Sequence, residues 1–416
     1  MKIVMNKRIY ILLTMLFVFI GANADNGSNS PYTRYGVGML SSQGMGINRQ
    51  MGGLGYGLRS HNYINILNPA SFAEADTLTM LFDAGFSLQN VNFSENGKRI
   101  NAQNASFDYV AVQFRIMKNL GMSAGFLPYS TVGYSFSTKS AEGTNEASVN
   151  SYNGTGGLYM PYIGLGWKPF KWLSVGVVGS YLYGNITHEV GINFTNSTDI
   201  SRVYNASIKS YKVDFGVQFA KKFGQKHDIV LGATYSLGHS LNAKAEITDV
   251  TASSTKTENI EEGFKLPHTY GAGFTYTYNG KWTVGADYTL QKWGTASFFG
   301  DNRGVDRSIV SVGAEYCPGT VSKNPFKMMT YRAGAYYAQP YTEIKGKKGC
   351  EEYGVSAGVS LPFFNNNNRS SHATLHISGQ YIHMEPKSAG MIAENYLRIN
   401  IGITFNESWF MKLKVR

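Results

Sequence analysis

Alternation of side-chain character with a period of two is the feature that most constrains the fold of this chain. Near the C-terminus the odd positions from Leu397 to Phe405 are apolar, whereas the positions between them are polar, charged or glycine. Successive side chains of a β-strand point to opposite faces, so this period predicts a two-faced strand. The same pattern recurs along most of the chain in long stretches rich in Tyr, Phe and Gly. We therefore expect an all-β protein built from long strands.

An export signal precedes the alternating region. Three basic residues come first, apolar residues follow over 9–20, and Ala22-Asn23-Ala24 supplies small residues for cleavage. This arrangement predicts a signal peptide over residues 1–24 and a mature chain that starts at Asp25. The apolar run is shorter than the ~20 residues that a membrane-spanning helix needs, so a retained helical anchor is disfavoured.

No later apolar stretch is long enough to cross a bilayer as a helix. An exported chain that spans a membrane must then use strands, because only helices and closed barrels satisfy their backbone groups in lipid. Basic residues on the second face of the strands would cost about 2–4 kcal/mol against lipid. We expect the charged residues of that face to line a polar lumen: Lys212, Asp214, Asp287, Glu315, Arg332 and Arg398. A soluble exported β-protein is the alternative.

Fourteen alternating stretches follow residue 76, and an even number is typical of single-chain bacterial barrels. Short connections, such as the hairpin signal Asn279-Gly280, alternate with longer polar ones expected at 93–103, 139–157, 188–206 and 245–263. This predicts a transmembrane antiparallel β-barrel over 77–416, with short periplasmic turns, long external loops and both termini in the periplasm. Residues 25–76 show no sustained alternation and form a separate N-terminal region.

That region carries a second signal. A glycine-rich run from Met51 to Gly57 is followed by Asn68-Pro69-Ala70-Ser71 just before the first strand. This arrangement resembles the FadL/TodX-type outer-membrane transport proteins, and Ser30–Gly36 and Phe405–Phe410 are similar to segments of FadL-like barrels from Bacteroidetes. The resemblance implies that residues 25–76 form a hatch that plugs the lumen. It implies a hatch motif of Gly52, Gly53, Gly55, Gly57, Asn68, Pro69, Ala70 and Ser71.

The resemblance also implies passive uptake of hydrophobic or amphipathic small molecules, such as long-chain fatty acids or hydrocarbons. In the family a kink in the third strand opens a lateral gap through which the ligand leaves. The third strand expected here contains Pro128, flanked by Leu127 and Tyr129. Proline cannot donate to a β-ladder, so in mid-strand it requires an edge or a bulge. The alternative is that Pro128 lies at the barrel rim and shapes a turn.

Signals for catalysis or metal binding are weak. There is no Gly-x-Ser-x-Gly motif and no plausible Cys/His pair. His372 and His376 share a strand face but lie about 13 Å apart, too far for one ion. Cys317 and Cys350 are expected at opposite ends of the barrel as free thiols. We therefore expect no enzyme activity, no metal and no cofactor.

Two further expectations concern side chains at the membrane borders and in the loops. The Trp residues are expected mostly in aromatic belts at the two membrane interfaces: Trp167, Trp172, Trp282, Trp293 and Trp409. The acidic pairs Glu261-Glu262 and Glu351-Glu352 are expected in solvated loops.

The formal net charge is +11, and the basic residues are dispersed among the shorter connections. Dispersal and export argue against nucleic acid as a partner and favour anionic lipid headgroups of the outer membrane. The leading hypothesis is a hatch-gated channel in the cell outer membrane, with a hydrophobic small molecule as ligand and lateral exit through the wall. The alternative is a non-transporting subunit or scaffold of an outer-membrane assembly or secretion machine, with protein partners at the basic periplasmic rim.

Overall fold

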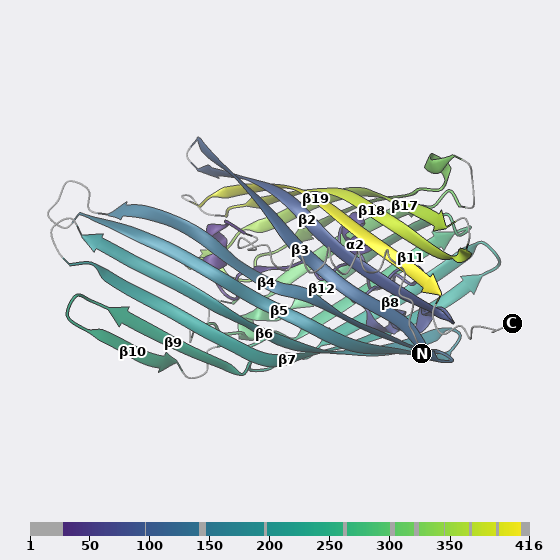
Figure 1. Ribbon diagram of the computed structural model, residues 1–416, viewed down its shortest axis with the longest axis horizontal. Coiled ribbons are helices and arrows are strands. Elements are labelled where there is room, and N and C mark those ends of the chain that lie inside the picture. The colour runs from purple at the N-terminus through teal and green to yellow at the C-terminus, as the bar shows by residue number, and fades with distance from the viewer. Residues whose placement is uncertain are drawn as a thin grey trace, which may run out of the picture.

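The fold is a closed antiparallel β-barrel of fourteen strands (Figure 1), which confirms the predicted fold class and strand number. The computed structural model describes residues 28–95, 97–140, 147–194, 198–260, 264–299, 304–319, 324–344, 346–365, 368–387 and 391–408. The predicted signal peptide, residues 1–24, lies outside these ranges. None of the helices within them is long and apolar enough to cross a membrane.

The barrel strands follow one another around the wall in chain order, each antiparallel to the next. The last strand pairs with the first, with Ile399 opposite Leu88, and this pairing closes the sheet. The strands are β2 (Thr79–Glu95), β3 (Lys98–Met117), β4 (Leu120–Ser140), β5 (Ser148–Phe170), β6 (Leu173–Phe194), β7 (Ile200–Phe223), β8 (His227–Ser236), β11 (Thr269–Tyr278), β12 (Trp282–Gln291), β13 (Arg307–Tyr316), β14 (Thr330–Ala338), β17 (Glu351–Asn365), β18 (Asn368–Glu385) and β19 (Ala393–Ser408).

The other elements are short. The N-terminal region contains η1 (Pro31–Arg34), β1 (Met39–Leu40), α2 (Gly46–Gln50) and η2 (Pro69–Glu74). We call the end of the barrel with the short connections, such as Asn279-Gly280, the turn end, and the opposite end the outer end. The connections at the outer end contain β9 (Ala243–Val250), β10 (Thr255–Ile260), η3 (Trp293–Thr295), β15 (Glu343–Ile344) and β16 (Lys347–Lys348). η4 (Pro325–Lys327) lies at the turn end. The first barrel strand starts and the last one ends at the turn end, where Thr79 pairs with Ser408.

The strands are very unequal in length. β4, β5, β6 and β7 have 21, 23, 22 and 24 residues, whereas β8, β11, β12 and β13 have ten each. About 9–11 tilted residues cross a bilayer, so β4–β7 continue far beyond it, toward the left of Figure 1. The expected long loops at 93–103, 139–157 and 188–206 were therefore wrong, because most of these residues are in strands. The expected loop at 245–263 contains most of the β9–β10 hairpin.

The alternation reverses its polarity along the long strands. On the part of β6 near the turn end, Val177 faces outward and is 38% exposed, while Ser180 faces the lumen and is buried. Beyond Tyr183 the inward side chain Ile186 is fully buried and the outward Glu189 is exposed. The change places the outer face against lipid on the turn-end side of Tyr183 and in water beyond Tyr183. A polar outer face with an apolar inner face is the arrangement of a water-soluble sheet.

Apolar side chains fill the lumen at the outer end. The connections β8–β11 and β12–β13 fold inward, and the ring of Phe299 packs edge-on against His188 of β6 and Tyr204 of β7. The ring of Trp293 lies 4.9 Å from that of Tyr341, which follows β14. Members of the same buried cluster come from both connections and from the wall: Leu241, Leu266, Phe298, Val132, Leu158, Leu182 and Ile208. A packed core therefore crosses the barrel mouth.

The N-terminal segment, residues 28–75, lies inside the barrel, and Figure 1 shows it enclosed by the strands. Glycines in the wall allow its backbone to approach directly. A Cβ atom added to Gly176 of β6 would lie 2.3 Å from the carbonyl carbon of Pro69. One added to Gly232 of β8 would lie 1.9 Å from the carbonyl oxygen of Tyr56. Any larger side chain at these wall positions would displace the segment.

We predict that Gly176→Ala loosens the N-terminal segment without preventing closure of the barrel. The added methyl group collides with Pro69, so amide hydrogen exchange should rise over residues 56–75 while folded protein still shows heat-modifiable migration on gels. Gly179→Ala on the same strand is the matched control, because an added Cβ there meets nothing within 4 Å. Equal exchange in the two variants would contradict the assigned contact.

Candidate functional site in the barrel lumen

Arg49 of α2 holds the N-terminal segment to the wall through a buried ion pair. Its Nη1 atom lies 2.8 Å from Oδ2 of Asp108 on β3, and the two side chains are 4% and 8% exposed. Its Nε atom donates to the carbonyl oxygen of Gly44 at 2.8 Å, and the guanidinium lies 6.0 Å from the ring centroid of Tyr109. Removing one partner of such a pair leaves a buried charge without compensation.

Gln50 connects the same helix to three other strands. Arg332 of β14 donates from Nη1 to Oε1 of Gln50 at 2.9 Å and from Nε to Oε2 of Glu315 at 2.7 Å. The Nε2 atom of Gln50 donates to the carbonyl oxygens of Val359 on β17 and Ile377 on β18, at 3.1 and 3.4 Å. Glu315 and Arg332, which the sequence placed in the lumen, thus form an ion pair against α2.

The glycine run lies along β12 and its neighbours. Oδ2 of Asp287 accepts the N–H groups of Gly55 and Tyr56 at 2.6 and 2.9 Å. The carbonyl oxygen of Gly57 accepts a hydrogen bond from Oγ1 of Thr275. Two of the run's members, Gly52 and Gly53, have φ of +65° and +84°, in the left-handed region that glycine adopts most readily. The run therefore makes close backbone contact with the wall.

Asn68 organises the turn before the first barrel strand. Its Oδ1 atom accepts from the N–H of Ala70 at 3.1 Å and so caps η2, while Pro69 occupies the first helical position. Its Nδ2 atom donates to the carbonyl oxygens of Tyr56 and of Val217 on β7, at 2.9 and 3.1 Å. One side chain thus joins the helix, the glycine run and the wall.

The end of η2 is held by charge. Ser71 donates from Oγ to the carbonyl oxygen of Asn65 at 2.9 Å. Glu74 forms ion pairs with Arg59 of the segment and Lys168 of the wall. Although burial opposes ionisation of Glu74, these two cations hold its pKa below the usual value. The carboxylate is therefore charged at neutral pH.

Pairing between β3 and β4 stops partway along both strands. The ladder runs from Met117 opposite Leu120 to Val110 opposite Phe126, and within the described chain it goes no further. Beyond this point β3 stays paired with β2, and β4 with β5. The two strands separate toward the outer end in Figure 1. We call this interval, residues 98–109 of β3 and 127–140 of β4, the seam.

Pro128 lies at the start of the seam, in the interior of β4 and not at the barrel rim. It is opposite Tyr159 of β5, and the register shifts between Pro128 and Ser130, which leaves Tyr129 as a bulge residue. Leu127 is fully buried. A residue without an N–H group and a bulge thus coincide with the end of the β3–β4 ladder.

The N-terminal segment covers the edge of β4 that β3 leaves. β1 pairs with this edge, Met39 opposite Thr131 and Leu40 opposite Ser130. The N–H of Ser41 donates to the carbonyl oxygen of Tyr129 at 3.0 Å. Farther along, the N–H of Gly133 donates to Oγ1 of Thr33 at 3.2 Å. A stretch of the segment therefore takes the place of a neighbouring strand.

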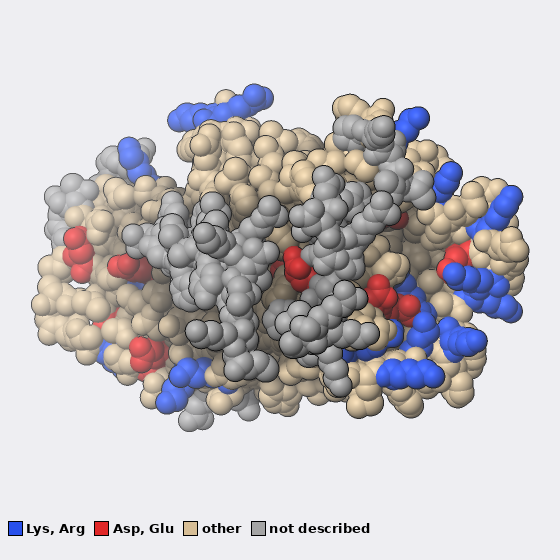
Figure 2. All heavy atoms as spheres, turned by 45° about the vertical axis from the view of Figure 1, so that its right-hand side comes forward, with Lys and Arg blue, Asp and Glu red and all other residues tan. Residues whose placement is uncertain are grey.

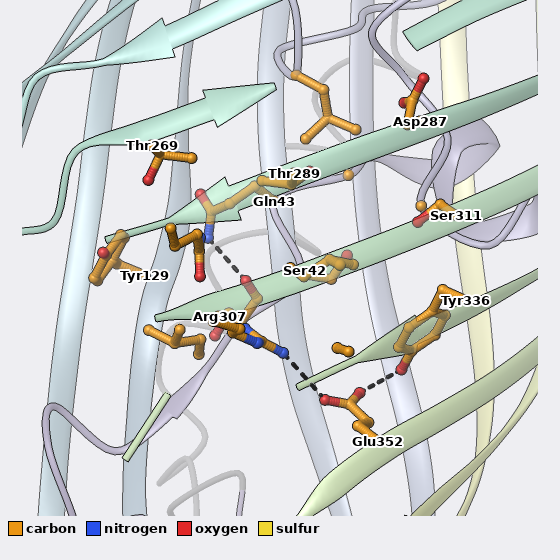
Figure 3. A pocket seen from close by; sticks show the side chains of 18 of the residues that line it. Ser42, Gln43, Tyr129, Thr269, Asp287, Thr289, Arg307, Ser311, Tyr336 and Glu352 are labelled. Carbon is orange, nitrogen blue, oxygen red and sulfur yellow. Dashed lines mark hydrogen bonds and ion pairs between the residues drawn. The ribbon is translucent and has the colours of Figure 1, made fainter. Parts of the chain in front are cut away.

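A cavity of about 310 Å³ lies at the centre of the lumen, bordered by the N-terminal segment. Figure 3 shows Arg307 and Tyr336 converging on Glu352, and Arg307 Nη2 lies 3.3 Å from Glu352 Oε2. Lys212 and Asp214 of β7 form a second ion pair at the cavity wall. Of the six charged residues placed in the lumen by sequence, four line this cavity: Lys212, Asp214, Asp287 and Arg398.

Arg307 and Glu352 were not identified from the sequence as residues of this cavity. Glu352 was assigned to a solvated loop, but it lies in β17 with its carboxylate in the cavity, whereas its neighbour Glu351 pairs with Lys387. Alternation of exposed Tyr353 and Val355 with lumen-facing Gly354 and Ser356 continues back to Glu352, which is the signal that identifies it. Arg307 begins β13 just before a similar alternation. The pair Glu261-Glu262 lies outside the described residues.

Other sequence expectations have mixed outcomes. Trp167, Trp172 and Trp282 are about half exposed, but Trp293 is fully buried in the mouth core, so its assignment to a membrane belt was wrong. Packing against Tyr341 and Phe298, and not strand position, decides its burial. Trp409 and the side chain of His372 lie outside the described part of the chain.

The histidines, acidic side chains and cysteines are the residues that could bind a metal or react. No three His, Cys, Asp or Glu side chains among them are arranged to hold a metal ion. His376 is buried between the hydroxyls of Ser360 and Thr404, at 2.6 and 2.9 Å. Cys317 and Cys350 are free thiols, as expected. Burial raises the pKa of the Cys350 thiol to about 11, which keeps it protonated at neutral pH.

A family model described as BamG matches residues 5–416. The chain belongs to the BamG family. No curated protein matches it. The matched residues include all fourteen barrel strands and the N-terminal segment, so the match does not depend on a single motif.

Solved structures with a similar fold include two proteins described as toluene transporters and a FadL homologue. The toluene transporter TodX of Pseudomonas putida gives a TM-score of 0.61 at 16% identity, over 89% of this chain and all of that one. A FadL homologue of Pseudomonas aeruginosa gives 0.60 at 11% identity, over 89% and 99%. The toluene transporter TbuX of Ralstonia pickettii gives 0.56 at 14% identity, over 88% and 98%. At these identities the likeness establishes a FadL-like outer-membrane barrel fold.

We predict that Arg49→Met lowers the temperature at which the folded gel band is lost. It leaves the buried carboxylate of Asp108 without an opposite charge, which costs about 3–5 kcal/mol, and Arg49→Met with Asp108→Asn should recover most of the loss. Arg202→Met is the control, because the Arg202–Asp249 pair is solvent-exposed near the far ends of β7 and β9 and worth under about 1 kcal/mol. A similar loss in both single variants would show that Arg49 has no special role.

Proposed function

We propose that the protein is a non-transporting barrel subunit of an outer-membrane assembly or secretion machine. The observation that carries this proposal is the filled lumen. The N-terminal segment is attached to strands on all sides of the wall, and a packed apolar core crosses the mouth. A channel needs a continuous opening through which a solute can pass the lumen. A structural subunit needs only a rigid barrel wall. Membership in the BamG family supports the same reading more directly than a fold shared at low identity.

The charged groups of the central cavity weigh against a purely apolar ligand. Sites for hydrophobic ligands are lined mainly by apolar and aromatic side chains with few polar groups. Here apolar side chains such as Leu266, Ile309 and Ile382 share the lining with charged groups. The charged groups are the ion pairs Lys212–Asp214 and Arg307–Glu352, together with Asp287 and Arg398. A hydrocarbon in this cavity would contact charged groups that are better solvated by water.

The outer surface offers contact area for other proteins. β6 continues for about 35 Å beyond Tyr183, where the polarity of its faces reverses, and ends at Phe194. β4, β5 and β7 accompany it, and β9 pairs with the outer part of β7. These strands form a stiff polar wall on one side of the barrel, outside the bilayer. Such a wall suits recognition by a neighbouring subunit.

A disulfide that locks the segment tests this role. Met39 and Thr131 are direct antiparallel partners, so cysteines there fall within disulfide range. In a chain whose Cys317 and Cys350 are serine, oxidised Met39→Cys/Thr131→Cys protein should retain wild-type growth and the same stoichiometric outer-membrane partners after mild detergent extraction. The reduced form is the control. Absence of a stoichiometric partner from both wild type and variant would overturn the assembly role.

A second candidate is passive uptake of a hydrophobic small molecule with lateral exit. One observation favours it, namely the loss of β3–β4 pairing at the seam where Pro128 interrupts β4. Under this candidate the N-terminal segment acts as a hatch, and β1 must leave the edge of β4 to open the wall. The solved structures of similar fold include proteins described as toluene transporters.

The same lock separates the two candidates. If the seam is an exit, uptake of a labelled fatty acid or toluene should fall strongly in the oxidised Met39→Cys/Thr131→Cys protein and return on reduction. Pro128→Ala should also reduce uptake, because alanine restores an N–H group to β4. Uptake that is equal in oxidised, reduced and Pro128→Ala protein, or no greater than in cells without the barrel, would exclude lateral transport.

A further inference from the structure

Exposed lysines gather at the turn end of the barrel. Figure 2 shows Lys and Arg side chains concentrated at this end, on the right of the view. The lysines come from five successive turns and the strand ends beside them: Lys118, Lys171, Lys221, Lys222, Lys226, Lys281 and Lys327. Lys222 is 3.8 Å from Asp228 and is itself 79% exposed. We call these seven residues the basic arc.

Hydrogen bonds between neighbouring turns make the arc continuous. The N–H of Ala220 donates to the carbonyl oxygen of Trp172 at 2.8 Å, which joins the turn of Lys171 to the strand of Lys221 and Lys222. The N–H of Asn279 donates to the carbonyl oxygen of Lys226 at 2.6 Å. These contacts place the lysines side by side along one sector of the rim.

Aromatic side chains place the arc at the depth of lipid headgroups. The exposed rings of Phe170, Trp172 and Phe219 stack in series at 5.4 and 5.8 Å, and Trp282 stacks on Tyr316 at 4.2 Å. Tryptophan and tyrosine on the outer wall of a barrel mark the membrane interface. Lys171 and Lys281 are each adjacent in sequence to such a ring. Nζ of Lys221 lies 5.0 Å from the ring centroid of Phe223.

We propose that the basic arc binds the phosphate groups of anionic phospholipids in the leaflet at the turn end. Lysine ammonium groups beside an aromatic belt reach the phosphodiester level, where anionic lipid attracts each basic residue. An acidic protein is the less favoured partner, because Lys221 and the residues next to Lys171 and Lys281 belong to the lipid-facing belt. The inference is independent of the function proposed above, since it concerns only the lipid-facing rim at the turn end.

The test measures which lipids surround the folded barrel. Wild type and Lys171→Gln/Lys226→Gln/Lys281→Gln protein are reconstituted in vesicles of phosphatidylethanolamine with a minor fraction of phosphatidylglycerol. They are then extracted with their surrounding lipids by a styrene–maleic acid polymer. The control is Lys98→Gln/Lys256→Gln/Lys348→Gln, which removes three exposed lysines at the outer end. Heat-modifiable migration verifies folding of each protein.

Phosphatidylglycerol should be enriched around wild type and the control, by about fivefold at a site held by one lysine. The enrichment should fall toward the bulk ratio in the turn-end variant and in high salt, because exposed charges are screened. A wild-type lipid shell with bulk composition, or equal enrichment in the two triple variants, would overturn the proposal. So would a co-purifying protein that is lost only from the turn-end variant while its lipid shell is unchanged, since that would assign the arc to a protein partner.

Discussion

The need to pair every backbone group of a strand in a membrane governs this structure, because hydrocarbon supplies no hydrogen-bond partner. The pairing of β19 with β2 meets that need for the barrel as a whole. The ladder between β3 and β4 stops beyond Phe126, at the level where the outer face of the wall changes from apolar to polar. There the chain's own N-terminal segment supplies the partner through β1, Ser41 and Thr33. The contents of the lumen are therefore part of the wall.

This dependence explains why the segment is attached so firmly. A loose plug would expose the edge of β4 each time it moved. Buried contacts from Arg49, Gln50, Asp287 and Asn68 hold it to strands distributed around the barrel. Wall glycines allow backbone-to-backbone contact at Gly176 and Gly232. The same attachments that close the wall also occupy the space through which a solute would pass.

Much of the fold follows from local pattern. Period-two alternation is a property of each strand by itself, so fourteen strands and a lipid-facing surface are visible without a structure. The positions of Lys212, Asp214, Asp287 and Arg398 in the lumen follow from that alternation, because an ionised side chain against lipid is costly. The same reasoning failed beyond Tyr183. Where the outer face meets water, polar residues no longer indicate a loop or a lumen, and strands such as β6 continue through stretches expected to be irregular.

Local sequence is enough to specify the direction in which each side chain of a strand must point. Neighbouring positions and the polarity of lipid are enough to decide this. The contacts inside the barrel are set by the three-dimensional fold: the ion pair of Arg49 with Asp108, the contact of Arg307 with Glu352, the burial of Trp293 and the pairing of β1 with the edge of β4 at the seam. These contacts join residues far apart in the chain. Their geometry depends on barrel closure, strand register and inward folding of loops, which no single segment encodes.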